Sequence, residues 1–103
     1  MAKLSLDANP TFPAKVAIPV AGGAPVEVAF TFKHRTRDAL NDFLTTADKR
    51  TDVETLLGIV EGWELDDALN ADNMLRLTQS YLGAARAIIE KYIEEMTQAK
   101  AKN

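Results

Sequence analysis

The clearest pattern in the chain is an alternation of apolar and polar residues over positions 26–33. Its apolar members are Val26, Val28, Phe30 and Phe32. Because residues two apart share one face of a strand, this alternation predicts a half-buried β-strand. Residues 15–20 alternate in the same way and predict a partner strand, and the intervening Gly22 and Gly23 suit a tight turn. The sequence therefore predicts a β-hairpin over residues 14–33.

The segment before this hairpin is predicted to be extended, because all four prolines of the chain lie within residues 1–25. Residues 1–13 are expected to form an N-terminal arm, in which residues 3–6 are a candidate for a short third strand. Pro19 has no N–H to donate, which predicts that the first strand of the hairpin lies at a sheet edge. Together with Lys15 it is expected to blunt that edge against pairing with another chain.

From residue 36 onward, apolar residues recur every three or four positions, which is the spacing of amphipathic α-helices. The first helix is expected to begin after Thr36, whose hydroxyl suits the N-cap position. The second is expected to begin after Thr51, because Thr51 and Glu54 have the spacing of a capping box. Gly62 is expected to end this second helix.

Two more helices complete the predicted helical region. The third is expected to start around Asn70, and the fourth to run from Ala84 to about Lys100. A two-stranded hairpin is marginally stable alone, so its apolar face must rest on the helices. The predicted fold is therefore α+β in a single domain, residues 1–103, with the N-terminal β-hairpin followed by a small bundle of about four α-helices over residues 36–100.

Composition narrows the possible chemistry. The 103 residues include no cysteine and a single histidine, His34, while 47% of them are hydrophobic. A disulfide, a thiolate site and a histidine-based zinc site are thereby excluded, and without a nucleophile motif neither an enzyme nor a cofactor is predicted. Glu64, Asp66 and Asp67 offer oxygen ligands for a hard cation, but they lack the spacing of a calcium-binding loop and are interpreted as a solvated loop. No apolar run is long enough to predict a membrane span or a signal peptide.

The charge is divided unevenly between the two halves of the chain. The net charge is −3, but residues 1–50 hold seven basic against five acidic side chains, whereas residues 51–103 hold five against ten. An acidic chain is a poor match for nucleic acid, whose phosphates supply most of the binding affinity. The basic cluster at residues 33–37 is compatible with phosphate contact, but without a recognisable motif a solvated junction between strand and helix is favoured.

Surfaces for protein partners are the remaining candidates for function. Six residues are predicted to contact a partner: Trp63, Tyr81, Ile89, Tyr92, Ile93 and Met96. Trp63 follows Gly62 in an expected loop, where a tryptophan serves either as a plug of the core or as an interface anchor. The apolar stripe of the fourth helix is explained either by core packing or, in its last turns, by contact with another chain.

Four segments of the chain stand in a distinctive order and spacing. They are Phe32-Lys33-His34-Arg35-Thr36-Arg37, then Asp52-Val53 followed by Ile59-Val60-Glu61-Gly62-Trp63-Glu64-Leu65, then the positions Asn73, Leu75, Leu77 and Tyr81, and finally Ala84-Ala85 with Ile88, Tyr92, Lys100 and Lys102-Asn103. Together they resemble the tail assembly chaperones of long-tailed bacteriophages, from Lys15 to the end of the chain. This family commonly has a proline after the tyrosine, where the chain has Leu82, a departure that bears on the break between the third and fourth helices.

This resemblance implies a non-enzymatic helper in the cytoplasm of an infected or lysogenic bacterium, absent from the finished virion. Such chaperones coat the long, helical tape measure protein and keep it soluble while tail tube subunits polymerise around it. The resemblance also implies two further partners: the tail tube protein, and a frameshift-extended form of the same protein, of which this chain would be the shorter product.

Two other interpretations of the sequence stay open. The protein is alternatively a minor structural component that remains in the tail, or a small DNA-binding regulator that uses residues 33–37. Self-association is expected as well, since the opposite charge balance of the two halves would favour head-to-tail contacts between copies.

Overall fold

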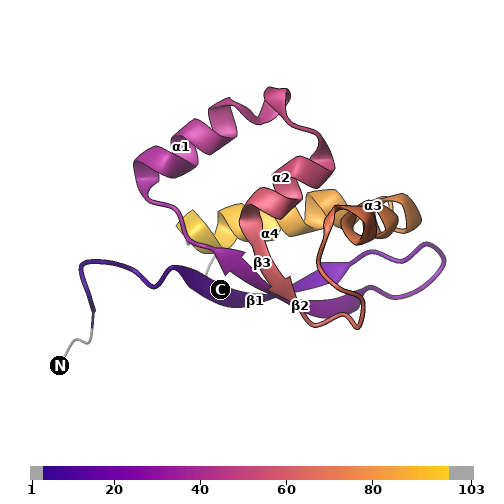
Figure 1. The fold of residues 1–103 in the computed structure, drawn as a ribbon. Helices are drawn as coiled ribbons and strands as arrows, with labels where there is room; N and C mark the ends of the chain where they lie inside the picture. Colours follow the sequence, from indigo (N-terminus) through magenta and orange to yellow (C-terminus); the bar gives the residue numbers. More distant parts are fainter. Residues whose placement is uncertain (1–3, 98–103) are drawn as a thin grey trace.

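Two long strands form the hairpin that the alternating pattern predicts. The computed structural model describes residues 4–97, in which β1 (Thr11–Ile18) and β2 (Val26–Lys33) pair antiparallel (Figure 1). The register runs from Thr11 opposite Lys33 to Ile18 opposite Val26. In the connecting loop, Gly22 has a φ of 77°, a left-handed conformation that glycine adopts without steric cost.

β1 begins at Thr11, so residues 11–13, which were expected in the arm, belong to the sheet. The N–H of His34 bonds the carbonyl oxygen of Pro10 at 2.8 Å, which shows that even-numbered residues of this strand turn their backbone groups toward β2. Pro13 therefore faces the open edge, where its missing N–H removes no bond of the ladder. The predicted edge position of the first strand is confirmed, because β2 lies between β1 and the third strand of the sheet, β3 (Val60–Trp63).

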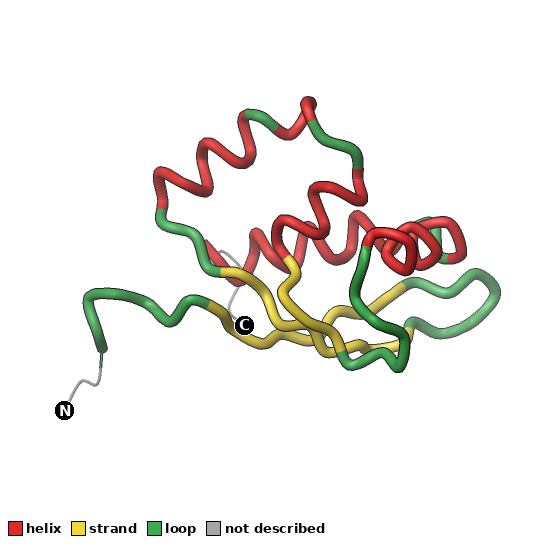
Figure 2. The backbone as a smooth tube through the Cα atoms, viewed as in Figure 1, coloured by secondary structure: helices red, strands yellow, loops and turns green. Residues whose placement is uncertain are grey.

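Ahead of β1, residues 4–10 form a shorter arm than the sequence predicts. It runs away from the rest of the molecule, at the end opposite to helix α3 (Ala71–Ser80), as Figures 1 and 2 show. The prediction of a short strand at residues 3–6 is wrong for residues 4–6, which form no strand. Lys3 lies outside the described residues.

The sheet has a third strand, β3 (Val60–Trp63), which pairs antiparallel with β2 on the side away from β1. Phe30 lies opposite Trp63, and Phe32 lies opposite Val60. The expectation that the second helix ends at Gly62 is wrong, because the chain leaves the helix at Val60. The side chain of Val60 is buried, so joining the sheet extends the apolar core.

Helices make up most of the remaining chain. Within residues 4–97 they are α1 (Arg37–Thr45), the 3-10 helix η1 (Ala47–Lys49), α2 (Asp52–Ile59), α3 (Ala71–Ser80) and α4 (Ala84–Thr97). The predicted N-caps Thr36 and Thr51 are confirmed, since the side chain of each accepts a backbone N–H from the first turn of a helix. Asn70, where the third helix was expected to start, caps α3 in the same way. The capping box of Thr51 and Glu54 is complete. The expected end of the last helix near Lys100 lies outside the described residues.

The helices cover one face of the sheet, so the fold has two layers (Figure 1). The core between the layers is made of apolar residues from both: Val16, Ile18, Val28, Phe30, Phe32, Leu40, Leu56, Ile59, Val60, Met74, Ala84, Ile88 and Tyr92. The ring centroid of Tyr92, in α4, lies 5.5 Å from that of Phe32 and 6.2 Å from that of Phe12. The predicted α+β class is confirmed.

Candidate functional site

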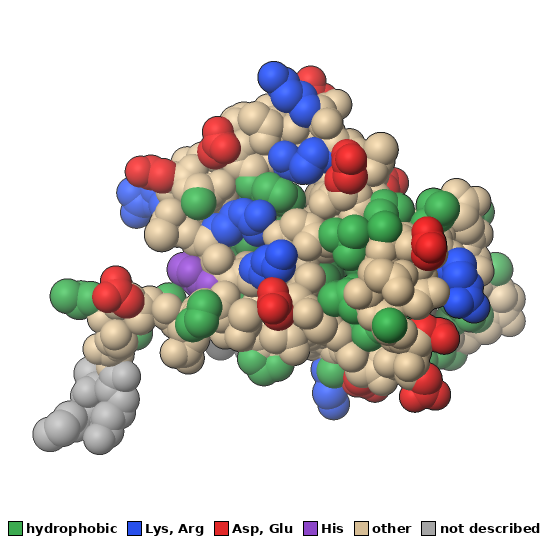
Figure 3. All heavy atoms as spheres, in the orientation of Figure 1, with side chains coloured by type: hydrophobic (Ala, Val, Ile, Leu, Met, Phe, Trp, Pro, Cys, Tyr) green, Lys and Arg blue, Asp and Glu red, His purple; other side chains and the backbone are tan. Residues whose placement is uncertain are grey.

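A pocket of about 410 Å³ opens between helix α3 and the loop that follows β3. We call it the Trp63–Tyr81 pocket, and its lining residues are Trp63, Leu65, Asp66, Asp67, Asn73, Arg76, Leu77, Ser80 and Tyr81. Two of the six predicted partner contacts, Trp63 and Tyr81, thus lie in one pocket. The lining combines apolar side chains with charges of both signs, and Figure 3 shows a similar mixture over the face that it draws.

Trp63 is held from both sides. Its indole Nε1 donates to the carbonyl oxygen of Asp67 at 2.8 Å, which fixes the loop over the ring. Its ring meets the buried ring of Phe30 edge-on, with centroids 6.4 Å apart and an interplanar angle of 69°. The sequence left open whether Trp63 is a core plug or a surface anchor; in the structure it is half-buried, packing on the core and lining the pocket.

The other wall of the pocket is tied to the same loop by Asn73 of α3. Its Nδ2 donates to the carbonyl oxygen of Ala68 at 2.7 Å, and its Oδ1 accepts a bond from Nη1 of Arg76 at 2.9 Å. Arg76 is exposed at the pocket, so its charge is available to a partner. Tyr81, at the end of α3, is 39% exposed.

Sequence analysis missed most of the pocket lining. A signal was present, because Asn73, Leu77 and Tyr81 follow one another at four-residue spacing and therefore share one face at the α3 segment. The loop residues Leu65 and Asp66 carry no such signal, since only the tertiary fold brings them opposite that face.

The acidic residues beside the pocket do not assemble a metal site. The carboxylate of Glu64 is used in the sheet, where its Oε1 accepts the N–H of Ala29 at 2.7 Å in place of a backbone carbonyl. The N–H of Glu64 in turn bonds the carbonyl oxygen of Ala29 at 3.1 Å. Within residues 4–97, no group of three His, Cys, Asp or Glu side chains is placed to hold a metal ion.

Tyr92 belongs to the core and not to the surface on which the sequence analysis placed it. Its side chain is 1% exposed. Its hydroxyl donates to the carbonyl oxygen of Lys33 at 2.8 Å and accepts a bond from Nη1 of Arg35 at 3.1 Å. It can therefore position other residues, but it presents no surface to a partner.

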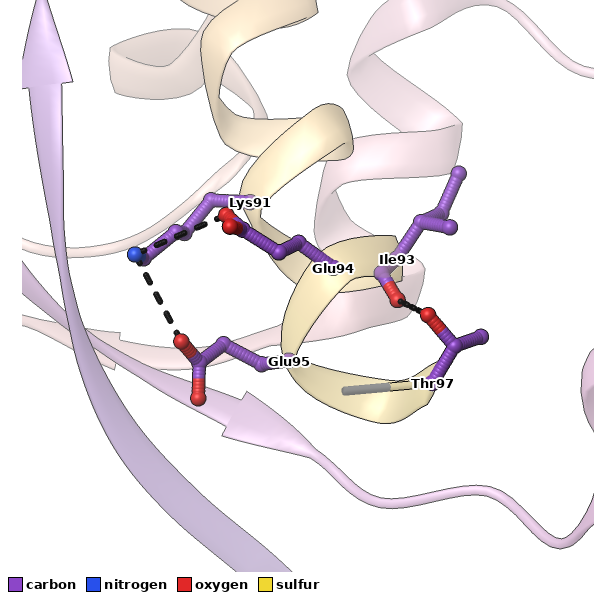
Figure 4. Close-up of polar contacts among 5 residues, drawn as sticks. All are labelled: Lys91, Ile93, Glu94, Glu95 and Thr97. Carbon is purple, nitrogen blue, oxygen red and sulfur yellow. Dashed lines mark hydrogen bonds and ion pairs between the residues drawn. The ribbon is translucent and has the colours of Figure 1, made fainter. Parts of the chain in front are cut away.

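The remaining predicted contacts, Ile89, Ile93 and Met96, form a half-buried stripe on α4. Their spacing is that of a helix face that meets another helix. Figure 4 shows Ile93 pointing away from the charged group on the other side of the helix, where Nζ of Lys91 lies 3.4 Å from Oε2 of Glu95. None of these three residues lines the Trp63–Tyr81 pocket.

The solvent side of α4 carries a further ion pair, between Arg86 and Glu90. Nε of Arg86 donates to Oε2 of Glu90 at 2.8 Å, and this bond together with the carboxylate charge raises the pKa of Arg86. Both side chains are largely exposed, so the pair is screened by solvent and marks the outer face of the helix.

Met96 lines a second pocket, of about 420 Å³, near the junction of β2 and α1. The other lining residues are His34, Arg35, Thr36, Arg37, Leu40 and Thr97. This junction contains the basic cluster of residues 33–37. Two of its cations are engaged within the fold: the Arg35 guanidinium lies 4.0 Å from the ring centroid of Phe43, and Nζ of Lys33 donates to the carbonyl oxygen of Leu57 at 3.3 Å.

Comparison with protein families decides what kind of protein this is. The family model described as phage tail assembly chaperone matches residues 1–103, the whole chain. The chain belongs to this family. Comparison with curated protein sequences and with solved structures gives no significant match.

Membership of the phage tail assembly chaperone family assigns the chain a chaperone role in building a phage tail, with phage tail proteins as its partners. Among the described helices, none combines the length and the apolar composition needed to cross a membrane.

Proposed function

We propose that this chain binds the tape measure protein of its phage and keeps it soluble while the tail is assembled. The observation that carries the proposal is the match of the phage tail assembly chaperone family over all 103 residues. A tape measure protein is the long, helical tail component that chaperones of this kind are expected to coat. Its chaperone therefore needs a surface that accepts a helix.

The surface best suited to a helix is the stripe of Ile89, Ile93 and Met96 with the adjoining second pocket. The three side chains are half-buried, so they retain apolar area for a partner while their positions are fixed by the core. Arg37 and Leu40 line the pocket beside Met96 and add a positive charge next to apolar surface. This combination favours a client helix whose apolar stripe is flanked by acidic residues.

Weak contacts are sufficient for such a client. A long helix offers many similar segments, and copies bound side by side strengthen one another through high local concentration. Each copy can still leave when tail tube subunits arrive, because no single contact is tight.

The test is co-expression of the chain with the tape measure protein of the same phage. We expect the soluble amount of tape measure protein to rise and the two proteins to co-purify. Met96→Glu places a charge in the stripe and should lower the co-purified amount by about tenfold, the effect of losing about 1.4 kcal/mol of binding. If the wild-type chain neither co-purifies with the client nor raises its solubility, the proposal is wrong.

Gln79→Glu is the matched control. It introduces the same charged residue at an exposed position of α3 that lines neither pocket described above. We expect this variant to retain the wild-type amount of client. Equal losses in both variants would mean that net charge, and not the stripe, decides binding.

The proposal includes action in the host cytoplasm and release before the virion is complete. Mass spectrometry of purified particles should then find no copies of the chain. Stoichiometric copies in the particle would instead support a minor structural tail component. Contacts with the tail tube protein and with a frameshift-extended form belong to the same assembly step and can be sought by co-purification from the same cells.

A further inference from the structure

The N-terminal arm exposes two large apolar side chains to solvent. Leu4 is 90% exposed and Leu6 is 101% exposed, the highest values among the large apolar residues within the described chain. Burying one leucine side chain favours the buried state over the exposed state by more than about tenfold. Leaving two leucines in water is therefore unfavourable. Exposed apolar side chains on a projecting segment are typical of a segment that a partner covers.

The Trp63–Tyr81 pocket has the complementary character. Trp63, Leu65 and Leu77 give it apolar walls, and its volume of about 410 Å³ is ample for two leucine side chains. The pocket is lined partly by α3. The arm projects from the end of the sheet opposite to α3 (Figures 1 and 2), so the arm and the pocket lie at different ends of the molecule.

The charges around the two features also match. In the sequence the two leucines are flanked by Lys3 on one side and Asp7 on the other. The pocket lining contains the acidic Asp66 and Asp67, and on helix α3 the basic Arg76. An arm laid across the pocket can therefore meet opposite charge at both of its ends.

We propose that Leu4 and Leu6 of one copy of this chain dock into the Trp63–Tyr81 pocket of a second copy. This contact is heterologous, because the two copies contribute different surfaces. In an assembly that does not close into a ring, it leaves one free arm and one free pocket at the ends. Copies thus join in an open series, which suits a long client. The proposal goes beyond the proposed binding of the tape measure protein and uses a different surface, so either can fail without the other.

The test mixes two variants that are each defective in one half of the contact. Leu4→Ala/Leu6→Ala removes the apolar side chains of the arm and keeps the pocket. Ser80→Trp fills the pocket from an exposed position in its lining and keeps the arm. Sedimentation velocity over a range of concentrations measures self-association, and circular dichroism confirms that both variants are folded.

The wild-type chain is expected to associate in a concentration-dependent series. Each variant alone should associate at least about tenfold more weakly, as the loss of a buried leucine requires. The mixture of both variants should form dimers that stop growing, because only one intact arm and one intact pocket remain to combine. A wild-type chain that stays monomeric, or a mixture that forms no dimer, would overturn the proposal.

Further variants distinguish docking of the arm from non-specific apolar association and test the charges. Leu82→Ala removes a leucine that is 87% exposed but does not line the pocket, and it should leave the association unchanged. Asp7→Arg and Arg76→Asp should each weaken association severalfold, and their combination in one chain should restore it. Weakening by Leu82→Ala equal to that of the arm variant, or no recovery in the double charge reversal, would contradict the docking.

Discussion

The hydroxyl of Tyr92 donates a hydrogen bond to the carbonyl oxygen of Lys33 at 2.8 Å, linking the last helix to the end of β2 across 59 positions of the chain. The same hydroxyl accepts a bond from Arg35, whose guanidinium lies over the ring of Phe43 in α1. One buried phenol therefore holds together the sheet, the junction after it and two helices. Tyr92, which the sequence analysis predicts to contact a partner, instead connects several elements of the fold through its buried hydroxyl.

Tyr92→Phe should remove both hydrogen bonds of the hydroxyl while leaving the aromatic ring in place. The carbonyl of Lys33 and the Nη1 of Arg35 would each lose a partner, and an unsatisfied buried polar group costs about 1–3 kcal/mol. For a domain of this size each kcal/mol lowers the midpoint of thermal unfolding by roughly 4–8 °C. Calorimetry or thermal circular dichroism measures the shift.

Tyr81→Phe is the control for this prediction. It removes the same atom from a tyrosine that is 39% exposed, and surface changes of this kind stay within about 0.5 kcal/mol. Equal midpoints for Tyr92→Phe and wild type would show that the buried hydroxyl contributes no net stability.

The sequence predicts those parts of this fold that local chemistry determines. The alternation over β2 and the N-cap side chains of Thr36 and Thr51 involve only neighbouring residues, so the sequence alone reveals them. β3 was missed because it has only four residues and follows α2 directly. Its reason for being a strand is the pairing of Trp63 with Phe30, far away in the sequence.

The candidate surfaces were predicted less well for the same reason. Helical periodicity shows that Ile88, Ile89, Tyr92 and Ile93 belong to an apolar stripe, but it does not show how deeply each one is buried. Tyr92 faces the sheet and is buried, whereas Ile89 and Ile93 lie beside it and stay half-buried. The Trp63–Tyr81 pocket forms where the loop after β3 is hydrogen-bonded to Asn73 of α3. No local sequence pattern predicts this contact between loop and helix.

Glu64 should stabilise the edge of the sheet through its side chain. Glu64→Ala removes the acceptor of the Ala29 N–H, and we expect a loss of about 1 kcal/mol in the free energy of unfolding. Hydrogen exchange followed by NMR should show faster exchange of the Ala29 amide. Glu64→Gln keeps an acceptor oxygen and should retain most of the protection; an Ala29 amide that exchanges equally in all three proteins would refute the role.

The capping box at the start of α2 should be a second local source of stability. The side chain of Thr51 accepts the N–H of Glu54 at 3.1 Å, and the carboxylate of Glu54 accepts the N–H of Thr51 at 2.9 Å. Thr51→Ala is expected to cost about 1 kcal/mol in urea denaturation, the usual value for a lost N-cap. Thr45→Ala, in the last turn of α1, removes a hydroxyl without removing a cap and should change stability by less than about 0.5 kcal/mol.

Gly83, at the turn between α3 and α4, lies so close to the hairpin loop that a side chain there would press on Pro19. A Cβ atom there would stand 3.0 Å from Cγ and 3.3 Å from Cβ of Pro19, and a proline ring cannot rotate out of the way. Gly83→Ala should therefore destabilise the protein by about 1–3 kcal/mol, as overpacking does. Gly23→Ala is the control, because its Cβ would meet only Val20 Cγ1 at 3.7 Å, and it should be neutral or slightly stabilising.

The contact between Gly83 and Pro19 can be isolated by a double-mutant cycle. Adding Pro19→Ala to Gly83→Ala removes the ring that the new Cβ meets, so part of the lost stability should return. If the two changes are instead additive, the cost of Gly83→Ala comes from the turn itself and not from its packing on the loop. A positive coupling would show that the break between α3 and α4 is positioned by packing against a proline from the hairpin.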